Sequence, residues 1–340
     1  MSENSNLNSL TYIKMNTDKK ITKAIIEWYI GLKATGPRLE KPILWAQGTF
    51  NPFYVDNRML QSQPLARELI RKGLANTIKK GRVIDYVYGI PSAGIAPATL
   101  LARQLNVPLL VQHKDEYYSI DLARAEEFLY AYPSIMHADT DVIAGTVPFG
   151  IILGLILAEI QNKPFIFVRE KAKDHGTQQQ IEGIYTAGSW ATLISPYFDK
   201  GYTQDAKTAL EASGIDPIAL LDERIQDLFE KVTYFEGKTI VGVEDLISSG
   251  ESMIGKIDPL LKKGATVMVR AIFNYKLPTA TKNFLNYGLD VVSLVDFEEL
   301  KEELYMRGLL TDDEYLKLQE WFIDQVNWGT NHGFPPPTKK

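Results

Sequence analysis

The segment Thr239-Ile-Val-Gly-Val-Glu-Asp-Leu-Ile-Ser-Ser-Gly-Glu-Ser252 decides the fold class of this 340-residue chain. Residues 239–243 are mostly apolar and predict a buried strand, and the polar residues after them lead into a helix expected over 252–263. A stop at Gly264 and a second apolar strand, expected over 266–273, follow. Strands that alternate with helices in this way lie parallel in one sheet, so the segment predicts an α/β fold.

Two further strand-loop-helix-strand patterns precede this segment, over 85–111 and 141–168. They extend the prediction to a doubly wound, mainly parallel sheet. Seven residue pairs recur between them at a constant spacing of 56: Asp85/Asp141, Gly89/Gly145, Gly94/Gly150, Ile95/Ile151, Leu101/Leu157, Ala102/Ala158 and Pro108/Pro164. Duplication explains this match, but so does convergence, because glycine suits tight turns and apolar residues suit buried strands. Both explanations stay open.

Composition describes an ordinary globular protein, 45% apolar, with a length that suggests about two domains. The net charge of -5 argues against a nucleic-acid surface. Cysteine is absent, and the four histidines lack metal-site spacing. The uncharged stretch 142–158 approaches the length of a membrane span, but its glycines and proline favour a buried β-α unit. Residues 1–12 lack a signal-peptide pattern, so we expect a cytoplasmic protein without membrane or nucleic-acid partners.

The loop after the strand at 239–243 has the chemistry of a phosphate site. Ser248, Ser249, Gly250 and Ser252 offer hydroxyls and backbone N–H groups at a helix N-terminus, where the helix dipole favours an anion. The carboxylates of Glu244 and Asp245 can hold ribose hydroxyls or, through water, a magnesium ion. A lone acidic pair would more often just end a strand, but the whole string favours a ligand site. Glu251 would repel a phosphate, so we expect it to point outward.

A second polar loop, 168–176, carries Arg169, Lys171, Lys173 and His175 directly after an apolar strand. Such a cluster is often only a solvated loop. It can also neutralise a pyrophosphate, and cations that meet the growing charge of a leaving group stabilise the transition state more than the ground state. His175 could in addition protonate or hydrogen-bond a leaving oxygen.

Both loops resemble motifs of one enzyme family. Val243-Glu-Asp-Leu-Ile-Ser-Ser-Gly250 resembles the signature for phosphoribosyl pyrophosphate (PRPP) in type I phosphoribosyltransferases, in particular the Glu-Asp-Leu-Ile-Ser-Thr-Gly form of orotate phosphoribosyltransferases. Residues 168–176 resemble the mobile catalytic loop of the same enzymes; Arg169, Lys173 and His175 match it directly. Glu170 departs from the lysine usual there, and Lys171 can substitute for that lysine. The segments 43–58, 271–278 and 296–300 resemble the family's base-covering and carboxyl-terminal parts.

The resemblance implies a division of the chain and a set of roles. We expect an N-terminal helix and hood over 1–80, an additional β-α unit over 81–140, a phosphoribosyltransferase core from 141–183 and 237–285, a mostly helical insertion over 184–236, and a carboxyl-terminal strand, helices and polar tail over 286–340. The PRPP-binding set is Arg169, Lys171, Glu244, Asp245, Ser248, Ser249, Gly250, Glu251 and Ser252. The catalytic set is Lys173, His175 and Asp245, and the base-binding set is Ala46, Tyr54 and Ser249.

The implied reaction is transfer of the phosphoribosyl group from PRPP to orotate, with Mg²⁺ held mainly through PRPP and water. The basic loop would reach a neighbouring subunit, which implies a homodimer. Continuity with that loop favours the turn 145–150 for the pyrophosphate, although 91–97 resembles the family's Thr-Ala-Gly-Ile-Pro turn better. Transfer to a different base and a non-catalytic PRPP-sensing regulator remain the alternatives.

Overall fold

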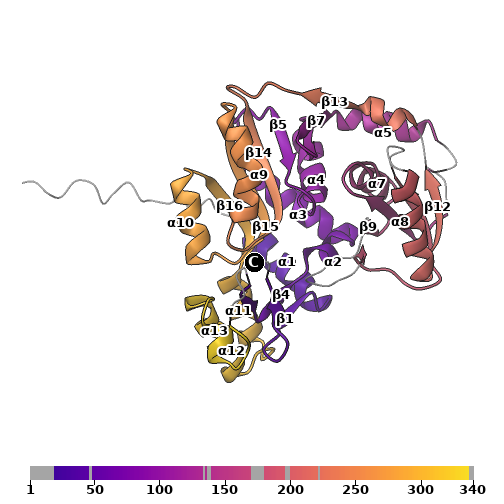
Figure 1. Ribbon diagram of the computed structural model, residues 1–340. Coiled ribbons are helices and arrows are strands. Elements are labelled where there is room, and N and C mark those ends of the chain that lie inside the picture. Colours follow the sequence, from indigo (N-terminus) through magenta and orange to yellow (C-terminus); the bar gives the residue numbers. More distant parts are fainter. Residues whose placement is uncertain are drawn as a thin grey trace, which may run out of the picture.

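The strands of the chain are divided between two main sheets and two small two-stranded pairs (Figure 1). The computed structural model describes residues 19–45, 48–132, 135, 139–169, 180–195, 200–220 and 223–336. Within these ranges one sheet has seven strands in the order β13-β7-β6-β5-β14-β15-β16, and the other has five in the order β10-β9-β8-β11-β12.

The seven-stranded sheet is mainly parallel. Its strands are β5 (Tyr86–Gly89), β6 (Leu109–His113), β7 (Glu116–Ile120), β13 (Phe229–Val232), β14 (Thr239–Ile247), β15 (Thr266–Asn274) and β16 (Asp290–Asp296). Only β7 and β13, at one edge, run antiparallel to their neighbours. This is the doubly wound, mainly parallel sheet that the sequence predicts, and it includes the strand, helix and strand expected around 239–273.

The order of the strands creates a switch point between β5 and β14. From β5 the chain passes through α4 (Ile95–Leu105) to β6 on one side, and from β14 it passes through α9 (Glu251–Lys262) to β15 on the other. Right-handed crossovers in opposite directions place α4 and α9 on opposite faces of the sheet. The loops after β5 and β14 therefore diverge, and they leave a crevice at the carboxyl ends of these strands, where open α/β sheets bind ligands.

The five-stranded sheet repeats this arrangement. Its strands are β8 (Val142–Thr146), β9 (Phe165–Val168), β10 (Ile181–Glu182), β11 (Trp190–Ile194) and β12 (Asp216–Leu220). All are parallel except β10 at the edge. Two helices connect them, α7 (Phe149–Ile160) and α8 (Lys200–Ala212). Figure 1 shows α7, α8 and β12 grouped on one side of the molecule, away from α9 and β14.

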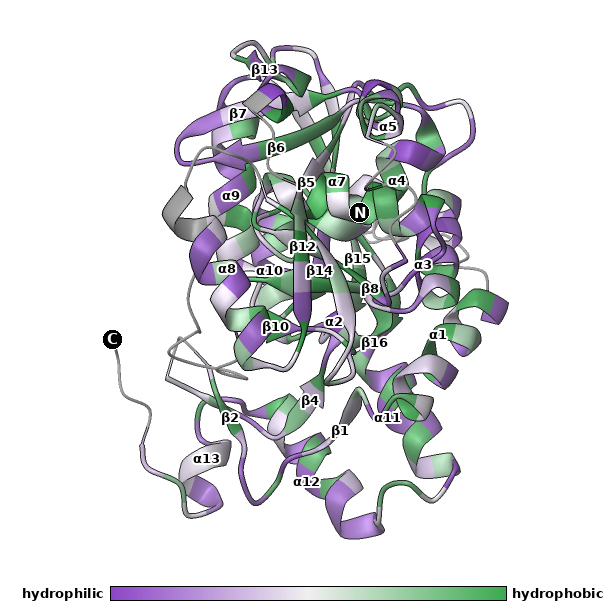
Figure 2. Cartoon of the chain, turned by 90° about the vertical axis from the view of Figure 1, so that its right-hand side faces the viewer, coloured by the Kyte–Doolittle hydropathy of each residue, from purple (hydrophilic) through white to green (hydrophobic). Residues whose placement is uncertain are grey.

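Helix α7 explains the uncharged stretch 142–158. Its residues are buried almost all round because it packs against β8 and also against α4 and α5 (Leu122–Tyr130). Outer helices such as α1 (Lys19–Gly31) and α3 (Pro64–Asn76) instead alternate between hydrophobic and hydrophilic stretches (Figure 2). The expected β-α unit is thus confirmed, and no helix in the described part of the chain is long and apolar enough to span a bilayer.

An aromatic hood covers the crevice. The short pairs β1 (Thr35–Pro37) with β4 (Phe53–Val55) and β2 (Ile43–Leu44) with β3 (Phe50–Asn51) lead into α2 (Asn57–Gln61). The chain ends with α10 (Pro278–Asn286), α11 (Phe297–Met306), α12 (Asp312–Ile323) and α13 (Trp328–Asn331). Trp321 of α12 donates from Nε1 to the Phe50 carbonyl at 2.9 Å and contacts Trp45 edge-on, so the two ends of the chain form one unit.

The division of the chain differs from the expected one. We expected 141–183 to join 237–285 in one core, but β14 lies beside β5, and β8 and β9 belong to the other sheet. The region 184–236 is not mostly helical either: it holds β11, β12 and β13 as well as α8 and the 3-10 turn Glu223–Leu228. Both units have the same apolar pattern, and only tertiary pairing decides which strand adjoins β14.

Candidate active site

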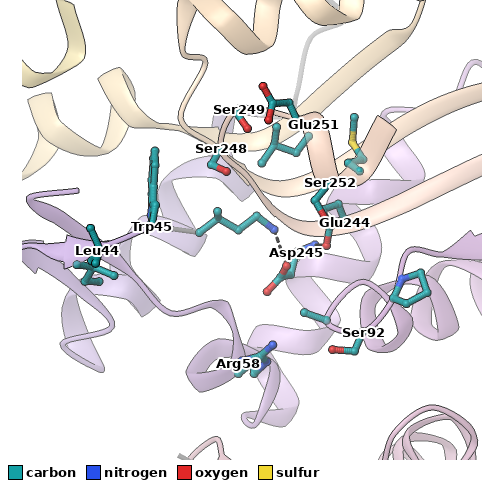
Figure 3. Close-up of a pocket in the computed structure, with 17 residues that line it drawn as sticks. Leu44, Trp45, Arg58, Ser92, Glu244, Asp245, Ser248, Ser249, Glu251 and Ser252 are labelled. Atoms are coloured by element: carbon teal, nitrogen blue, oxygen red, sulfur yellow. Dashed lines mark hydrogen bonds between the residues drawn. The ribbon is translucent and has the colours of Figure 1, made fainter. Parts of the chain in front are cut away.

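A cavity of about 620 Å³ opens at the switch point between β5 and β14. Four segments line it: the end of β14 with the loop that follows, the turn after β5, the hood and the start of α2 (Figure 3). The lining residues are Ile43, Leu44, Trp45, Arg58, Pro91, Ser92, Ala93 and every residue from Glu244 to Met253. The sequence-predicted residues Glu244, Asp245 and 248–252 therefore all lie at one cavity.

The phosphate loop depends on glycine at position 250. Gly250 precedes α9 with a φ of +77°, in the left-handed region, and a Cβ there would lie 2.4 Å from the Phe284 ring. Asn283 donates to the Ser249 carbonyl at 3.3 Å and supports the loop from α10. Because the first N–H groups of a helix lack intrahelical acceptors, the start of α9 offers donors and a positive dipole end to an anion in the cavity.

Glu244 and Asp245 lie side by side at the foot of the cavity. The Asp245 N–H donates to Glu244 Oε1 at 3.0 Å, and the Leu246 N–H donates to Asp245 Oδ1 at 2.8 Å. Buried Asn57 donates to the Asp245 carbonyl at 2.8 Å and fixes the strand end against α2. Burial, and next the negative charge of Asp245, raise the pKa of Glu244 well above its ordinary value near 4.5. Burial thus disfavours the charged form of Glu244.

Glu251 lies at the rim of the cavity. Its side chain is exposed at the first position of α9, and in Figure 3 its carboxylate lies on the far side of the loop from Asp245 and Arg58. A carboxylate in the first turn also interacts favourably with the helix dipole. Glu251 is therefore exposed at the rim, and its outward orientation with a ligand bound stays a prediction.

The turn opposite the carboxylates comes from the first β-α unit. Pro91, Ser92 and Ala93 line the cavity, whereas no described residue of the turn after β8 does. The turn after β5 fits closely against β14, since a Cβ on Gly94 would lie 2.1 Å from the Val243 carbonyl oxygen. Our preference for the turn 145–150 was wrong for this cavity, because continuity along the chain says nothing about which strand pairs with β14.

Three charged side chains link the rim of the cavity to the second sheet. Glu182 of β10 is 5% exposed and pairs with Arg58 of α2 and with Arg169, whose Nε lies 2.5 Å from Glu182 Oε2. Among the described residues, Arg58 is the single cationic side chain that lines the cavity. Arg169 lies at the start of the basic loop, and Glu182 follows the loop along the chain. Both ends of the loop therefore lie near the cavity of the same chain. Lys171, Lys173 and His175 lie outside the described residues.

The hood provides aromatic surface on the remaining side. Trp45 lines the cavity and packs edge-on against Tyr275 at 5.5 Å between ring centroids. Tyr54 lines a smaller neighbouring cavity of about 160 Å³, which shares Arg58 and Asp245 with the larger one. Its hydroxyl donates to Asp56 at 2.6 Å, and the Arg38 guanidinium lies 4.8 Å from its ring centre. Ala46, the other expected base contact from the hood, lies outside the described residues.

Three polar or aromatic lining residues were not predicted from the sequence as site residues. Trp45 and Arg58 were noted only as parts of a longer segment, and Ser92 belonged to the less favoured turn. An arginine at the start of a helix and a tryptophan after a short strand carry no local sign of a site. Their position follows from the packing of the hood against β14.

Side chains that could hold a metal ion were compared across the described residues. In the described ranges no group of three or more acidic or histidine side chains is arranged to hold a metal ion. Glu244 and Asp245 provide two carboxylates, which matches the way Mg²⁺ is bound when substrate phosphates and water complete its shell.

Comparison with known proteins gives a consistent group of relatives. No protein-family model matches the chain. It is 26% identical to the orotate phosphoribosyltransferase of Streptococcus pneumoniae serotype 19F (strain G54) over 309 residues, which cover 91% of this chain and 98% of the relative. The enzyme of the same name from Streptococcus pyogenes serotype M12 (strain MGAS2096) is also 26% identical, over 300 residues that cover 88% and 94%.

Solved structures that resemble the chain include orotate phosphoribosyltransferase from Aeropyrum pernix, with a TM-score of 0.41 and 12% identity over 82% of this chain and 98% of that one. Another is Leishmania donovani UMP synthase, with a TM-score of 0.43 and 14% identity over 89% of this chain and 41% of that one. Over nearly its whole length, the chain is therefore similar in sequence to orotate phosphoribosyltransferases.

Proposed function

We propose that the chain transfers the phosphoribosyl group of PRPP to orotate and releases orotidine 5'-monophosphate and pyrophosphate. One observation carries the proposal: two adjacent carboxylates and a serine-glycine loop at a helix N-terminus line a single cavity together with an aromatic hood. In the reaction a ring nitrogen of orotate forms a bond to the anomeric carbon. The bond from that carbon to the pyrophosphate oxygen breaks, and its electron pair leaves with pyrophosphate.

The 5-phosphate would bind at the start of α9. Ser248, Ser249 and Ser252 line the cavity there, and Gly250 leaves room for a phosphate to approach the backbone. The helix dipole and the N–H groups favour an anion of this kind. This contact anchors the sugar and is present in both the ground state and the transition state.

The ribose would lie over Glu244 and Asp245. The transition state of such a displacement has positive charge on the sugar ring, and a nearby anion stabilises it. The raised pKa of Glu244 fits this role, because burial disfavours its charged form and a cationic sugar ring beside it favours that form. Differential stabilisation of this kind lowers the barrier.

The pyrophosphate would face Ser92 and the basic loop. Arg58 already lines the cavity, and we propose that Arg169, Lys171, Lys173 and His175 add positive charge near the leaving group. Mg²⁺, bound through PRPP oxygens and held by Glu244 or Asp245 directly or through water, would neutralise charge on the departing pyrophosphate. Because the described flanks of the basic loop lie near the chain's own cavity, the loop need not come from another subunit. The homodimer stays a proposal that sedimentation can test.

The base would lie against the hood. Trp45 offers an aromatic surface at the cavity, and we keep Tyr54, Ala46 and Ser249 as proposed base contacts. A flat pyrimidine gains stacking energy on such a surface. Orotate also carries a carboxylate, and Arg58 is placed to attract it, although Glu182 competes for the same guanidinium.

A panel of bases in a pyrophosphate-release assay separates the alternatives. With PRPP and Mg²⁺ present, we expect release with orotate and little with uracil, adenine, guanine or hypoxanthine. Release with another base alone would identify a phosphoribosyltransferase of different specificity. Binding of PRPP without release for any base would identify a regulator and contradict the proposal.

A further inference from the structure

The two sheets repeat each other in hydrogen bonding as well as in strand order. Asp85 and Thr239 exchange two hydrogen bonds, from the Asp85 N–H to the Thr239 carbonyl at 2.9 Å and from the Thr239 N–H to Asp85 Oδ2 at 2.8 Å. Asp141 and Trp190 exchange the same two, at 2.8 and 2.9 Å. Convergence on a common fold does not require the same side-chain bond, so this match supports duplication.

Strand registers give the same correspondence along the whole unit. The pairs Tyr88 with Gly242 and Ala144 with Leu193 are equivalent, with offsets of 56 residues in one strand and 49 in the other. The tight approach of a turn glycine recurs as well: a Cβ on Gly150 would lie 2.3 Å from the Ile194 carbonyl oxygen, as one on Gly94 would lie 2.1 Å from that of Val243. The repeat therefore extends well beyond 141–168, to β12.

Chemistry at the two switch points is different. The offset of 49 places Ser195 and Pro196 at the positions of Glu244 and Asp245, so the second copy has no carboxylate there. Ser195 is completely buried, accepts from Thr146 at 3.2 Å and lies 2.8 Å from the Thr203 hydroxyl. At the position that corresponds to Glu244, the second copy thus has a buried hydroxyl that hydrogen-bonds two other hydroxyls.

The second copy is packed against the first through equivalent helices. α4 and α7 occupy corresponding positions in the two copies and contact each other, as the same surface does in a two-fold dimer. The contact is fixed by buried Arg67 of α3, which binds Glu159 of α7 at 2.6 Å and the Lys163 carbonyl at 2.9 Å. Glu182 reaches the rim of the cavity from the same side.

We infer that residues 139–220 are a degenerate internal copy without a PRPP site at its own switch point, so that each chain carries one PRPP site, at β14. Apart from its basic loop, this copy acts as a fixed support. The inference rests on the proposed function. It follows from the loss of both carboxylates in a unit whose backbone arrangement is kept. The second copy then resembles a partner subunit built into the chain.

Isothermal titration of the full chain with PRPP and Mg²⁺ tests the number of sites. We expect one PRPP per chain in the wild type, at least 100-fold weaker binding in the variant with Glu244→Gln and Asp245→Asn, and less than a threefold change in the variant with Ser195→Ala and Thr203→Val. Circular dichroism shows whether both variants are folded.

Two sites per chain would overturn the inference and leave the proposed function intact. Loss of binding in a folded Ser195→Ala, Thr203→Val variant would overturn it as well, because the second copy would then hold the ligand. No binding to the wild type would instead overturn the proposed function.

Discussion

The two copies within the chain share a backbone arrangement but differ at the loops that follow their central strands. At the first switch point Glu244 and Asp245 line an open cavity, and at the second the buried hydroxyl of Ser195 bonds to its neighbours. Strand order and parallel pairing are the same in both. The fold therefore supplies only the crevice. Carboxylates, an open turn and a helix terminus supply the chemistry.

Removing the carboxylates of the first copy should have the largest effect. For the double variant Glu244→Gln, Asp245→Asn we expect a fall in kcat/KM of about 1,000-fold, because the sugar cation loses its anionic partners. The matched change in the second copy, Ser195→Ala, should alter kcat/KM less than twofold. Steady-state kinetics with orotate and PRPP measure both, and similar losses in the two variants would remove the distinction between the copies.

Removing a charge from the basic loop should have the next largest effect on turnover. Lys173→Ala should lower kcat about 100-fold and change the Kd for PRPP less than threefold, because its charge is needed most when pyrophosphate departs. Lys256→Ala, an exposed lysine of α9, serves as the charge-matched control. Unchanged turnover in Lys173→Ala would exclude the lysine from the reaction.

The link between the copies at Glu182 should affect stability. Glu182→Gln removes the negative charge between Arg58 and Arg169, whose side chains are 13% and 14% exposed, and should lower the free energy of unfolding by about 2 kcal/mol. Glu116→Gln breaks a half-exposed pair with Lys231 and should lower the free energy of unfolding clearly less, because solvent screens the pair. Urea denaturation compares the two variants, and equal losses would mean that Glu182 does not hold the copies together.

A smaller effect on stability is expected from Glu244 and depends on pH. Its pKa is raised in the folded chain, so its contribution to stability is full below its ordinary pKa near 4.5 and is lost as the pH rises through the folded value. Glutamine stays neutral, so Glu244→Gln should be the more stable protein at pH 8, as urea denaturation can measure. Near pH 4 the difference should vanish. A variant less stable than wild type at pH 8 would contradict the raised pKa of Glu244.

Glu251 should have the smallest effect. Because its side chain is exposed at the rim, across the loop from Asp245, Glu251→Ser should tighten PRPP binding no more than about threefold. A tenfold or larger gain at moderate salt would show that Glu251 faces the phosphate after all.

Much of this arrangement could be predicted from local sequence. The strand at Thr239, the glycine before α9 and the paired carboxylates all carry local signals, and the structure has β14, Gly250 and α9 at these positions. The uncharged stretch 142–158 was likewise assigned correctly, because a glycine and a proline interrupt it.

The partner of β14 could not be predicted in this way. The two β-α units have almost the same pattern, and the choice between them is a matter of tertiary pairing, such as the bonds between Asp85 and Thr239. Arg58 and Trp45 reach the cavity only through the packing of the hood on β14 and α12. The strand β11 was missed because it is short and precedes the stronger helical pattern of α8.

The most direct measurement is the loss of orotate absorbance when the wild-type chain is mixed with PRPP and Mg²⁺. We expect steady loss of orotate with equimolar release of pyrophosphate, and a rate lower by about 1,000-fold in the Glu244→Gln, Asp245→Asn variant. Constant orotate absorbance with a folded wild-type chain and saturating PRPP would contradict it.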